Sequence, residues 1–306
     1  MAARILTQHL SSMPDVTVAR VALGLTVYVD DPLTWAREAA AAVLSSFLAR
    51  APEGEVVWYT TSLLSDWQRV GHASAGKLVD GLSQWQLVKP RHLLWARVVD
   101  DTGAPSVGFS YREVDSERAG RAGFVQLVLP QQHDAAVLLD LALEIGESWP
   151  VLCAVGGHLA TWNEYEKPTA FWHIYEWCRR YLGLDAQDPD AASAHVSHGL
   201  PGTSWLTFVG DGMADALEVD TSALEKHAWK TDVSVSRLAR GILLRAGDAP
   251  DLGDRNRLAY PAPYAEVARR LAPYILAEPP EYFGGFAEHR ATKRWMHRFL
   301  QPSEWT

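Results

Sequence analysis

The chain has 306 residues, of which 48% are hydrophobic and 21% are charged. This composition supports a large core and is unlike that of a disordered chain. The formal net charge is −9, whereas proteins that bind nucleic acid directly usually carry a basic patch or stripe. The charge argues against direct nucleic-acid binding. It fits an acidic surface that meets a basic partner, although solubility alone would also explain it.

The cysteines and the N-terminus indicate the compartment. Cys153 and Cys178 are the two cysteines of the chain, and we expect both to be buried, reduced thiols and not a disulfide scaffold. Residues 1–16 hold one arginine and no long apolar core, so the pattern predicts no secretory signal. No segment approaches the ~18–20 apolar residues of a membrane span. We therefore expect a soluble, cytoplasmic protein with no membrane partner.

The first part of the chain predicts strands and helices in alternation. Residues 19–29 alternate in hydrophobicity as a half-buried strand does. Asp31-Pro32 then supplies an N-cap and a first-turn proline for a helix whose apolar residues, from Trp35 to Phe47, recur at i, i+4 spacing. Further predicted elements are strands at Glu55–Ser62, Leu93–Val99, Val107–Glu113 and Phe124–Leu129 and a helix at Ser74–Trp85.

A second strand–helix–strand unit follows. Asp134 is the N-cap of an Ala- and Leu-rich helix that runs to about Ile145, and Val151–Val155 is a buried strand that ends at Gly156-Gly157. The order strand, capped helix, strand thus occurs at 19–62 and again at 124–156. An internal duplication and chance would both produce this order.

The remainder of the chain predicts a central helix and a mixed C-terminal part. Pro168 opens a helix at Thr169–Leu182 that is apolar or aromatic on almost every side, as a core helix is. Residues 184–203 have the composition of a polar linker. After them we predict strands at Ser204–Val209 and Leu238–Arg245, helices at Tyr264–Leu276 and Ala291–Leu300, and a Pro-rich loop at Glu278–Gly285.

These elements together predict an α+β fold with a largely antiparallel sheet flanked by helices. No linker is long or flexible enough to require two independent units, so we expect residues 1–306 to form a single domain.

Motifs for catalysis are weak. The sequence contains no Walker phosphate loop, no glycine-rich dinucleotide fingerprint and no Gly-x-Ser-x-Gly elbow. His158 together with Glu164 or Glu166 could form a general acid/base pair, so a metal-assisted hydrolase that uses them is one alternative function. His195 and His198 lie three residues apart and lack a third ligand at recognised zinc spacing.

The loop after the predicted strand 238–245 is rich in Asp and Gly. Asp248, Asp251, Asp254 and Asn256 have the composition of a calcium site but lack the alternating ligands and terminal Glu of an EF-hand loop. Asp and Gly also dominate ordinary turns. We therefore expect an ordered surface turn in which glycines adopt positive φ, and we predict no metal or cofactor.

This loop belongs to a set of segments that resembles the type VI immunity family, known first as a bacterial domain of unknown function. The motifs that carry the resemblance lie in residues 180–274. In chain order they are Tyr181-Leu182-Gly183-Leu184-Asp185, with Leu182 where a Pro is common, Ser204-Trp205-Leu206-Thr207-Phe208-Val209-Gly210-Asp211, Gly241-Ile242-Leu243-Leu244-Arg245-Ala246-Gly247, Pro250, Gly253-Asp254-Arg255-Asn256-Arg257, Tyr264-Ala265-Glu266-Val267-Ala268-Arg269-Arg270-Leu271 and Pro273.

The resemblance implies a non-enzymatic immunity protein that binds and neutralises a cognate polymorphic toxin, often a nuclease, of a type VI or related secretion system. It also implies that Trp205 and Phe208 are core residues and that Gly247 and Gly253 form turns. A structural scaffold protein is a further alternative. The candidate anchor and anions of a toxin interface are Trp162, Glu164, Glu166, Asp248, Asp251 and Asp254.

Overall fold

The computed structural model describes residues 6–29, 33–52, 55–62, 64–70, 79–80, 95–113, 121–288 and 290–305. At its centre lies β2 (Met13–Val29), which is buried over almost all of its length from Thr17 onward. β2 pairs antiparallel with β7 (Gly123–Pro130) along one edge and with β8 (Val151–Trp162) along the other. The predicted strand 19–29 is confirmed as the inner part of this longer strand.

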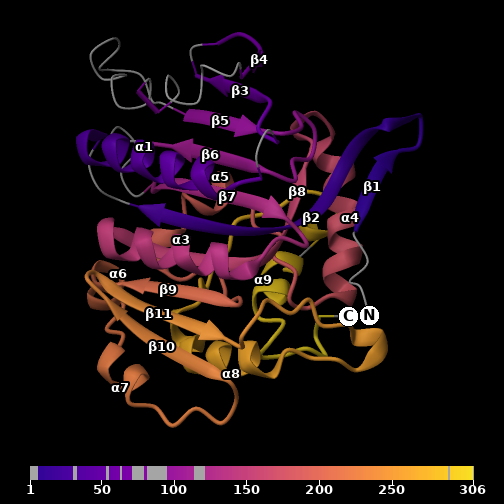
Figure 1. The fold of residues 1–306 in the computed structure, drawn as a ribbon. Helices are drawn as coiled ribbons and strands as arrows, with labels where there is room; N and C mark the ends of the chain where they lie inside the picture. Colours follow the sequence, from indigo (N-terminus) through magenta and orange to yellow (C-terminus); the bar gives the residue numbers. More distant parts are fainter. Residues whose placement is uncertain are drawn as a thin grey trace.

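The other strands extend the sheet on both sides of β2, and the strands that the structure describes pair with one another antiparallel. Beyond β7 lie β6 (Gly108–Arg112), β5 (Trp95–Val99), β3 (Trp58–Thr61) and β4 (Gln68–Arg69), and beyond β8 lie β9 (Leu206–Gly210), β11 (Gly241–Ala246) and β10 (Val233–Leu238). β1 (Thr7–Leu10) pairs with the first half of β2 in a hairpin that projects from the body (Figure 1). The predicted α+β class with an antiparallel sheet is confirmed.

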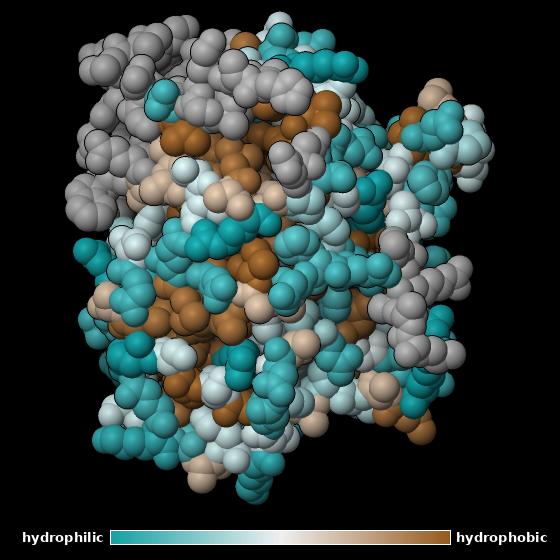
Figure 2. Space-filling view, viewed as in Figure 1, coloured by the Kyte–Doolittle hydropathy of each residue, from teal (hydrophilic) through white to brown (hydrophobic). Residues whose placement is uncertain are grey.

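Two helices lie side by side on one face of the sheet (Figure 1). They are α1 (Leu33–Arg50) and α3 (Ala135–Ser148), and they are joined by Arg50 and Glu144, whose charged atoms are 3.0 Å apart. α3 begins as predicted, because the Asp134 carboxylate accepts the Ala136 N–H. Figure 2 shows hydrophilic side chains on this outer face with hydrophobic patches between them.

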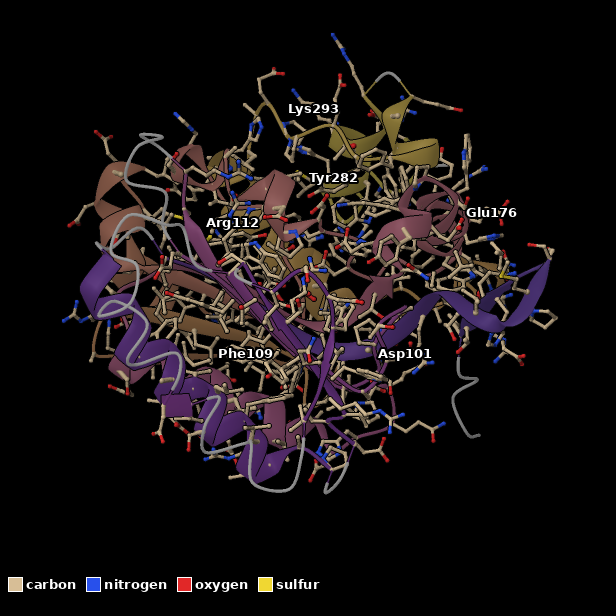
Figure 3. All side chains as sticks on the ribbon, turned by 90° about the horizontal axis from the view of Figure 1, so that it is seen from above. Asp101, Phe109, Arg112, Glu176, Tyr282 and Lys293 are labelled. Carbon is tan, nitrogen blue, oxygen red and sulfur yellow. The ribbon has the colours of Figure 1, made fainter. Side chains whose placement is uncertain are left out.

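The opposite face of the sheet carries helices from the C-terminal half of the chain. α4 (Lys167–Arg180) packs on β2 and β8, and α8 (Ala262–Leu271) packs on β11. α9 (Ala291–Met296) and the 3₁₀ turn η6 (Gly284–Ala287) complete this layer. Seen from above, Phe109 lies on the α1 side of the sheet and Tyr282 and Lys293 on the other (Figure 3). The sheet is therefore the middle of three layers.

Trp305 closes the core of this second layer. Its side chain is buried, its ring stacks on Phe286 with centroids 5.9 Å apart, and its Nε1 donates to the Cys178 carbonyl at 2.9 Å. Cys153 and Cys178 are both buried and unbridged, as predicted. Burial raises the pKa of the Cys178 thiol, which keeps it protonated.

The two strand–helix–strand units differ in their crossovers. In β7–α3–β8 the two strands are parallel to each other and only β2 lies between them, whereas in β2–α1–β3 three strands, β7, β6 and β5, lie between. Both helices lie on the same face. The units therefore share a helix placement but not a strand spacing.

Three sequence predictions are wrong in detail. β8 does not end at Gly156-Gly157 but continues to Trp162, because a Cβ at Gly156 would lie 2.9 Å from Leu25 Cδ1 and glycine there permits a close strand approach. The single strand predicted at 238–245 is a hairpin of β10 and β11. Residues 184–203 do not form an exposed linker, since Asp185, Gln187 and Asp188 are all buried.

The helix predicted at Ser74–Trp85 lies outside the described residues except at 79–80, and so does the predicted cap at Asp31-Pro32. Among the helices that the structure describes, none has the length and apolar character required to cross a bilayer.

The junction of β8 and β9 gives a test of this packing. A Cβ at Gly210 would lie 1.8 Å from the Val151 carbonyl oxygen, so Gly210→Ala should lower the free energy of unfolding by about 3 kcal/mol. Gly212 is two residues away with nothing within 4 Å of its built Cβ, and Gly212→Ala should be neutral or stabilising. Urea denaturation of both variants measures the difference, and equal midpoints would contradict the close approach of the strands.

Candidate functional site

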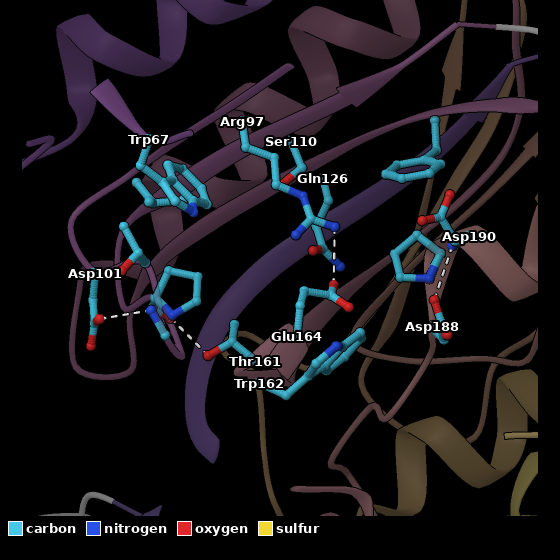
Figure 4. Close-up of a pocket in the computed structure, with 16 residues that line it drawn as sticks. Trp67, Arg97, Asp101, Ser110, Gln126, Thr161, Trp162, Glu164, Asp188 and Asp190 are labelled. Atoms are coloured by element: carbon cyan, nitrogen blue, oxygen red, sulfur yellow. Dashed lines mark hydrogen bonds and ion pairs between the residues drawn. The ribbon is translucent and has the colours of Figure 1, made fainter. Parts of the chain in front are cut away.

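A cleft opens over β5, β6 and β7 on the sheet face opposite α1 (Figure 4). Cross-strand register places five polar residues in one row under it, namely Thr60, Arg97, Ser110, Gln126 and Thr26. Gln126 Nε2 donates to Thr26 Oγ1 at 3.1 Å, which satisfies the buried end of the row. The sheet therefore presents hydrogen-bonding groups here and not an apolar surface.

The cleft consists of two adjoining hollows, an inner one of about 50 Å³ and an outer one of about 700 Å³. Arg97, Glu164 and Asp190 line both of them. The walls come from the loop that follows β5, from the end of β8 with the 3₁₀ turn η2 (Glu164–Glu166), and from α5 (Pro189–Ala192). Segments from distant parts of the sequence thus meet at this one place.

A capped turn places Glu164 over the sheet. Asn163 Oδ1 accepts the Tyr165 N–H at 3.0 Å and starts η2 directly after β8. Glu164 Oε1 then accepts from Arg97 Nη2 at 3.0 Å (Figure 4), and Glu164 Oε2 lies 3.6 Å from Lys167 Nζ. Of the predicted anions, Glu164 is the one that the structure places in the cleft lining.

Lys167 contacts several of the segments that form the wall of the cleft. Its Nζ lies 2.7 Å from Oδ2 of the buried Asp188, and it also lies over the ring faces of Trp162 at 5.4 Å and Phe283 at 5.5 Å. Asp188 in turn caps α5 through the Asp190 N–H. One cation therefore joins α4, α5 and the end of β8.

Trp162 forms part of the inner wall. Its side chain is 8% exposed and packs edge-on against Phe171, with ring centroids 4.9 Å apart. Its indole Nε1 is buried and has no hydrogen-bond partner among the described residues. The predicted anchor is therefore a recessed side chain with an unused donor.

The exposed aromatic residues beside the cleft were missed in the sequence. Tyr165 and Trp95 line the outer hollow, and Tyr165 is 81% exposed. Trp172 and Phe283 are exposed on the neighbouring surface of α4 and η6. A tyrosine between two glutamates in a capped turn was the one signal that could have identified Tyr165.

The predicted acidic loop lies elsewhere. Asp254 accepts two hydrogen bonds from Arg180, which hold its pKa below the usual range. Asp251 accepts the Gly253 N–H, and the exposed Asp248 lies 3.5 Å from Arg245. Arg180 and Lys167 lie at opposite ends of α4, which has 14 residues and is about 20 Å long. The candidate interface residues therefore fall into two separate places.

His158 and the glutamates are not brought together. His158 is largely buried beside Pro250 and Asp251, and its burial lowers its pKa to about 4. It precedes Trp162 by four strand residues, about 13 Å, while Glu164 pairs with Arg97. The acid/base pair of the hydrolase alternative is not assembled. Within the described ranges no group of three or more His, Cys, Asp or Glu side chains could hold a metal ion.

The signature segments contact one another. Gly183 N–H donates to the Leu252 carbonyl at 2.7 Å, and a Cβ at Gly183 would lie 1.9 Å from the Asp251 carbonyl oxygen. Trp205 Nε1 donates to the Gly247 carbonyl at 2.9 Å. Trp205 and Phe208 are buried, and Gly247 and Gly253 have positive φ, as the resemblance implied. These motifs hold the fold together at a distance from the cleft.

Comparison with known proteins identifies the family and a similar fold. Residues 44–299 match the family described as type VI immunity for VRR-NUC, and the chain belongs to this family. The structure is similar to that of the T6SS protein PA0821 of Pseudomonas aeruginosa, with a TM-score of 0.77 and 15% sequence identity over 98% of this chain and 90% of that chain. At this identity the likeness concerns the fold. No curated protein matches the chain.

The Lys167 junction can be tested by removing its charge. Lys167→Met would leave the buried Asp188 carboxylate without its cation and should lower the free energy of unfolding by about 3 kcal/mol. Lys293→Met is the matched control, since Lys293 pairs at 3.9 Å with a fully solvated Glu278, and it should change stability by less than about 0.5 kcal/mol. Chemical denaturation measures both, and equal losses would contradict the junction.

A pH series tests the buried state of His158. Because its folded-state pKa is about 4 and the ordinary value is 6.5, the unfolded chain binds more protons between these values. The stability from its neutral, buried form is therefore present above pH 6.5 and is lost as pH falls toward 4. Between about pH 7 and about pH 5 this loss amounts to about 2 kcal/mol, and replacement by Gln should remove it. Urea midpoints at about pH 7 and about pH 5 measure it, and parallel changes in wild type and variant would contradict it.

Proposed function

We propose that this protein is an immunity protein that binds and neutralises a nuclease toxin of the VRR-NUC kind, delivered by a type VI or related secretion system. The observation that carries the proposal is the family match over residues 44–299, a span that contains all the residues that line the cleft. The protein acts by binding, without turnover, in the cytoplasm where such a toxin meets DNA.

The charge of the chain supports this partner. A nuclease holds a polyanion and needs a cationic surface to do so, and the net charge of −9 on this chain complements such a surface. The same charge disfavours direct contact with nucleic acid or with an anionic membrane. Complementary fields also raise the association rate, which serves a protein that must reach its toxin early.

One antiparallel sheet that includes strands from Thr7 to Ala246 supports the further proposal that residues 1–306 act as one domain. The α4, α8 and α9 layer packs on this sheet and joins the C-terminal residues to it. The toxin would then bind to a single domain that is already folded.

The direct test is co-expression with the nuclease encoded by the neighbouring gene. Cells that make the toxin alone should stop growing, and cells that also make this protein should grow. A toxin variant without nuclease activity should co-purify with the protein through size-exclusion chromatography. Absence of both rescue and complex would refute the proposal, and nuclease inhibition without a complex would contradict the binding mechanism.

A further inference from the structure

We infer that the cleft over β5, β6 and β7 is the surface that receives the toxin, an inference that rests on the proposed function. Its occupant is a projecting, cationic segment of the nuclease domain. A lysine or arginine of this segment lies against the carboxylates at the mouth, and a carbonyl or other acceptor reaches Trp162 Nε1. Three features of the cleft lead to this assignment.

The first feature is the direction in which the ion pairs at the mouth face. In the Arg112–Asp190 pair the carboxylate side chain is 44% exposed and the guanidinium side chain 15%. Glu164 is 39% exposed, against 16% for Lys167 and 30% for Arg97. In these pairs the carboxylate is the more exposed partner, whereas Asp188 is more buried than Lys167 (6% against 16%). The oxygen atoms that a partner meets first are therefore those of Glu164 and Asp190. Such a mouth attracts a cationic segment although its charges are internally paired.

The second feature is the unused donor in the inner hollow. The Trp162 side chain is more than nine-tenths buried, it lines the hollow, and its Nε1 has no acceptor among the described groups. A buried N–H without a partner costs about 1–3 kcal/mol. Because Nε1 has almost no exposed area, an acceptor on a bound segment reaches it only when the side chains over it shift, and a polar tip on the occupant that does so removes this cost.

The third feature is the aromatic margin. Tyr165 and Trp95 line the outer hollow and expose their rings, and Tyr165 projects from a turn that is fixed by the Asn163 cap. Tyrosine and tryptophan are enriched among the residues that dominate binding energy. The exposed rings thus give the cleft the residue types in which protein interfaces are enriched, next to its hydrogen-bonding groups.

The loop at 247–254 lacks these features. Asp254 is held by Arg180, and Asp251 closes its own turn on Gly253. Asp248 is exposed, but neither hollow of the cleft includes it. The loop therefore provides matched controls on a surface about 20 Å away along α4.

The experiment measures binding of inactive toxin to the full chain by calorimetry, with variants in matched pairs. Glu164→Lys and Asp248→Lys make the same change of charge at two exposed carboxylates that each have an arginine nearby. Tyr165→Ala and Tyr260→Ala each remove an exposed ring. We expect Glu164→Lys to weaken binding by about 30-fold or more and Tyr165→Ala by about 10-fold. Both controls should stay within about twofold.

Trp162→Phe tests the donor separately. It keeps a ring under Lys167 and removes Nε1, so binding should weaken by about 5–10-fold. Thermal denaturation of each variant establishes that it is folded before it is scored. A folded Glu164→Lys or Tyr165→Ala variant that binds like wild type, or a stronger loss at Asp248 or Tyr260, would overturn the assignment of the cleft while wild-type binding upholds the proposed function. Failure of the wild type to bind would overturn both.

Discussion

The position of β2 between β7 and β8 is the constraint on which the other elements depend. A strand that is paired on both edges has its backbone N–H and C=O groups satisfied by its neighbours, and its side chains can then be apolar on both faces. The fit is close, because a Cβ at Gly24 would lie 2.1 Å from Leu159 Cδ2 and 2.7 Å from the Leu127 carbonyl oxygen. The register of β7 and β8 against β2 is thereby fixed, and with it the position of every strand further out.

The helices cover the two faces of this sheet unequally, and the cleft results from that difference. α1 reaches β6 on one face, where Phe47 meets Phe109, whereas on the other face α4 packs on β2 and β8. Among the described residues, the segments that line the cleft on that second face are short: residues 64–67, the loop after β5, η2 and the four-residue helix α5. Alternation along β5 then places Ala96 toward the apolar layer and Arg97 toward the cleft. The signature segments pack together at the Arg180 end of α4, away from the cleft.

Much of the fold could be predicted from the sequence, because its signals are local. The Asp134 cap, the apolar strands and the turn glycines at 247 and 253 are confirmed. The errors came from residues whose role depends on distant partners. Gly156 predicts the end of a strand as long as its spatial neighbour Leu25 is unknown. Gln187 predicts an exposed segment, because the Tyr28 hydroxyl that donates to its side chain lies 159 residues away in the sequence. For the candidate site, Trp162 and Glu164 were found by their residue types, but Arg97, Tyr165 and Asp190 become a cleft only through strand register.

The burial of Trp305 determines when a newly synthesised molecule can complete its fold. Its indole fills the space between α4 and η6 and caps the Cys178 carbonyl, which is synthesised 127 residues earlier. A ribosome that adds about 5–20 residues per second needs roughly 6 to 25 seconds to cover that interval. During this time the apolar side of α4 lacks its last cover, although β2, β7 and β8 have already been made. Under the proposed function, protection of the cell would depend on molecules that are complete before the toxin arrives, and a reserve of completed protein would serve the cell better than a rapid burst of synthesis.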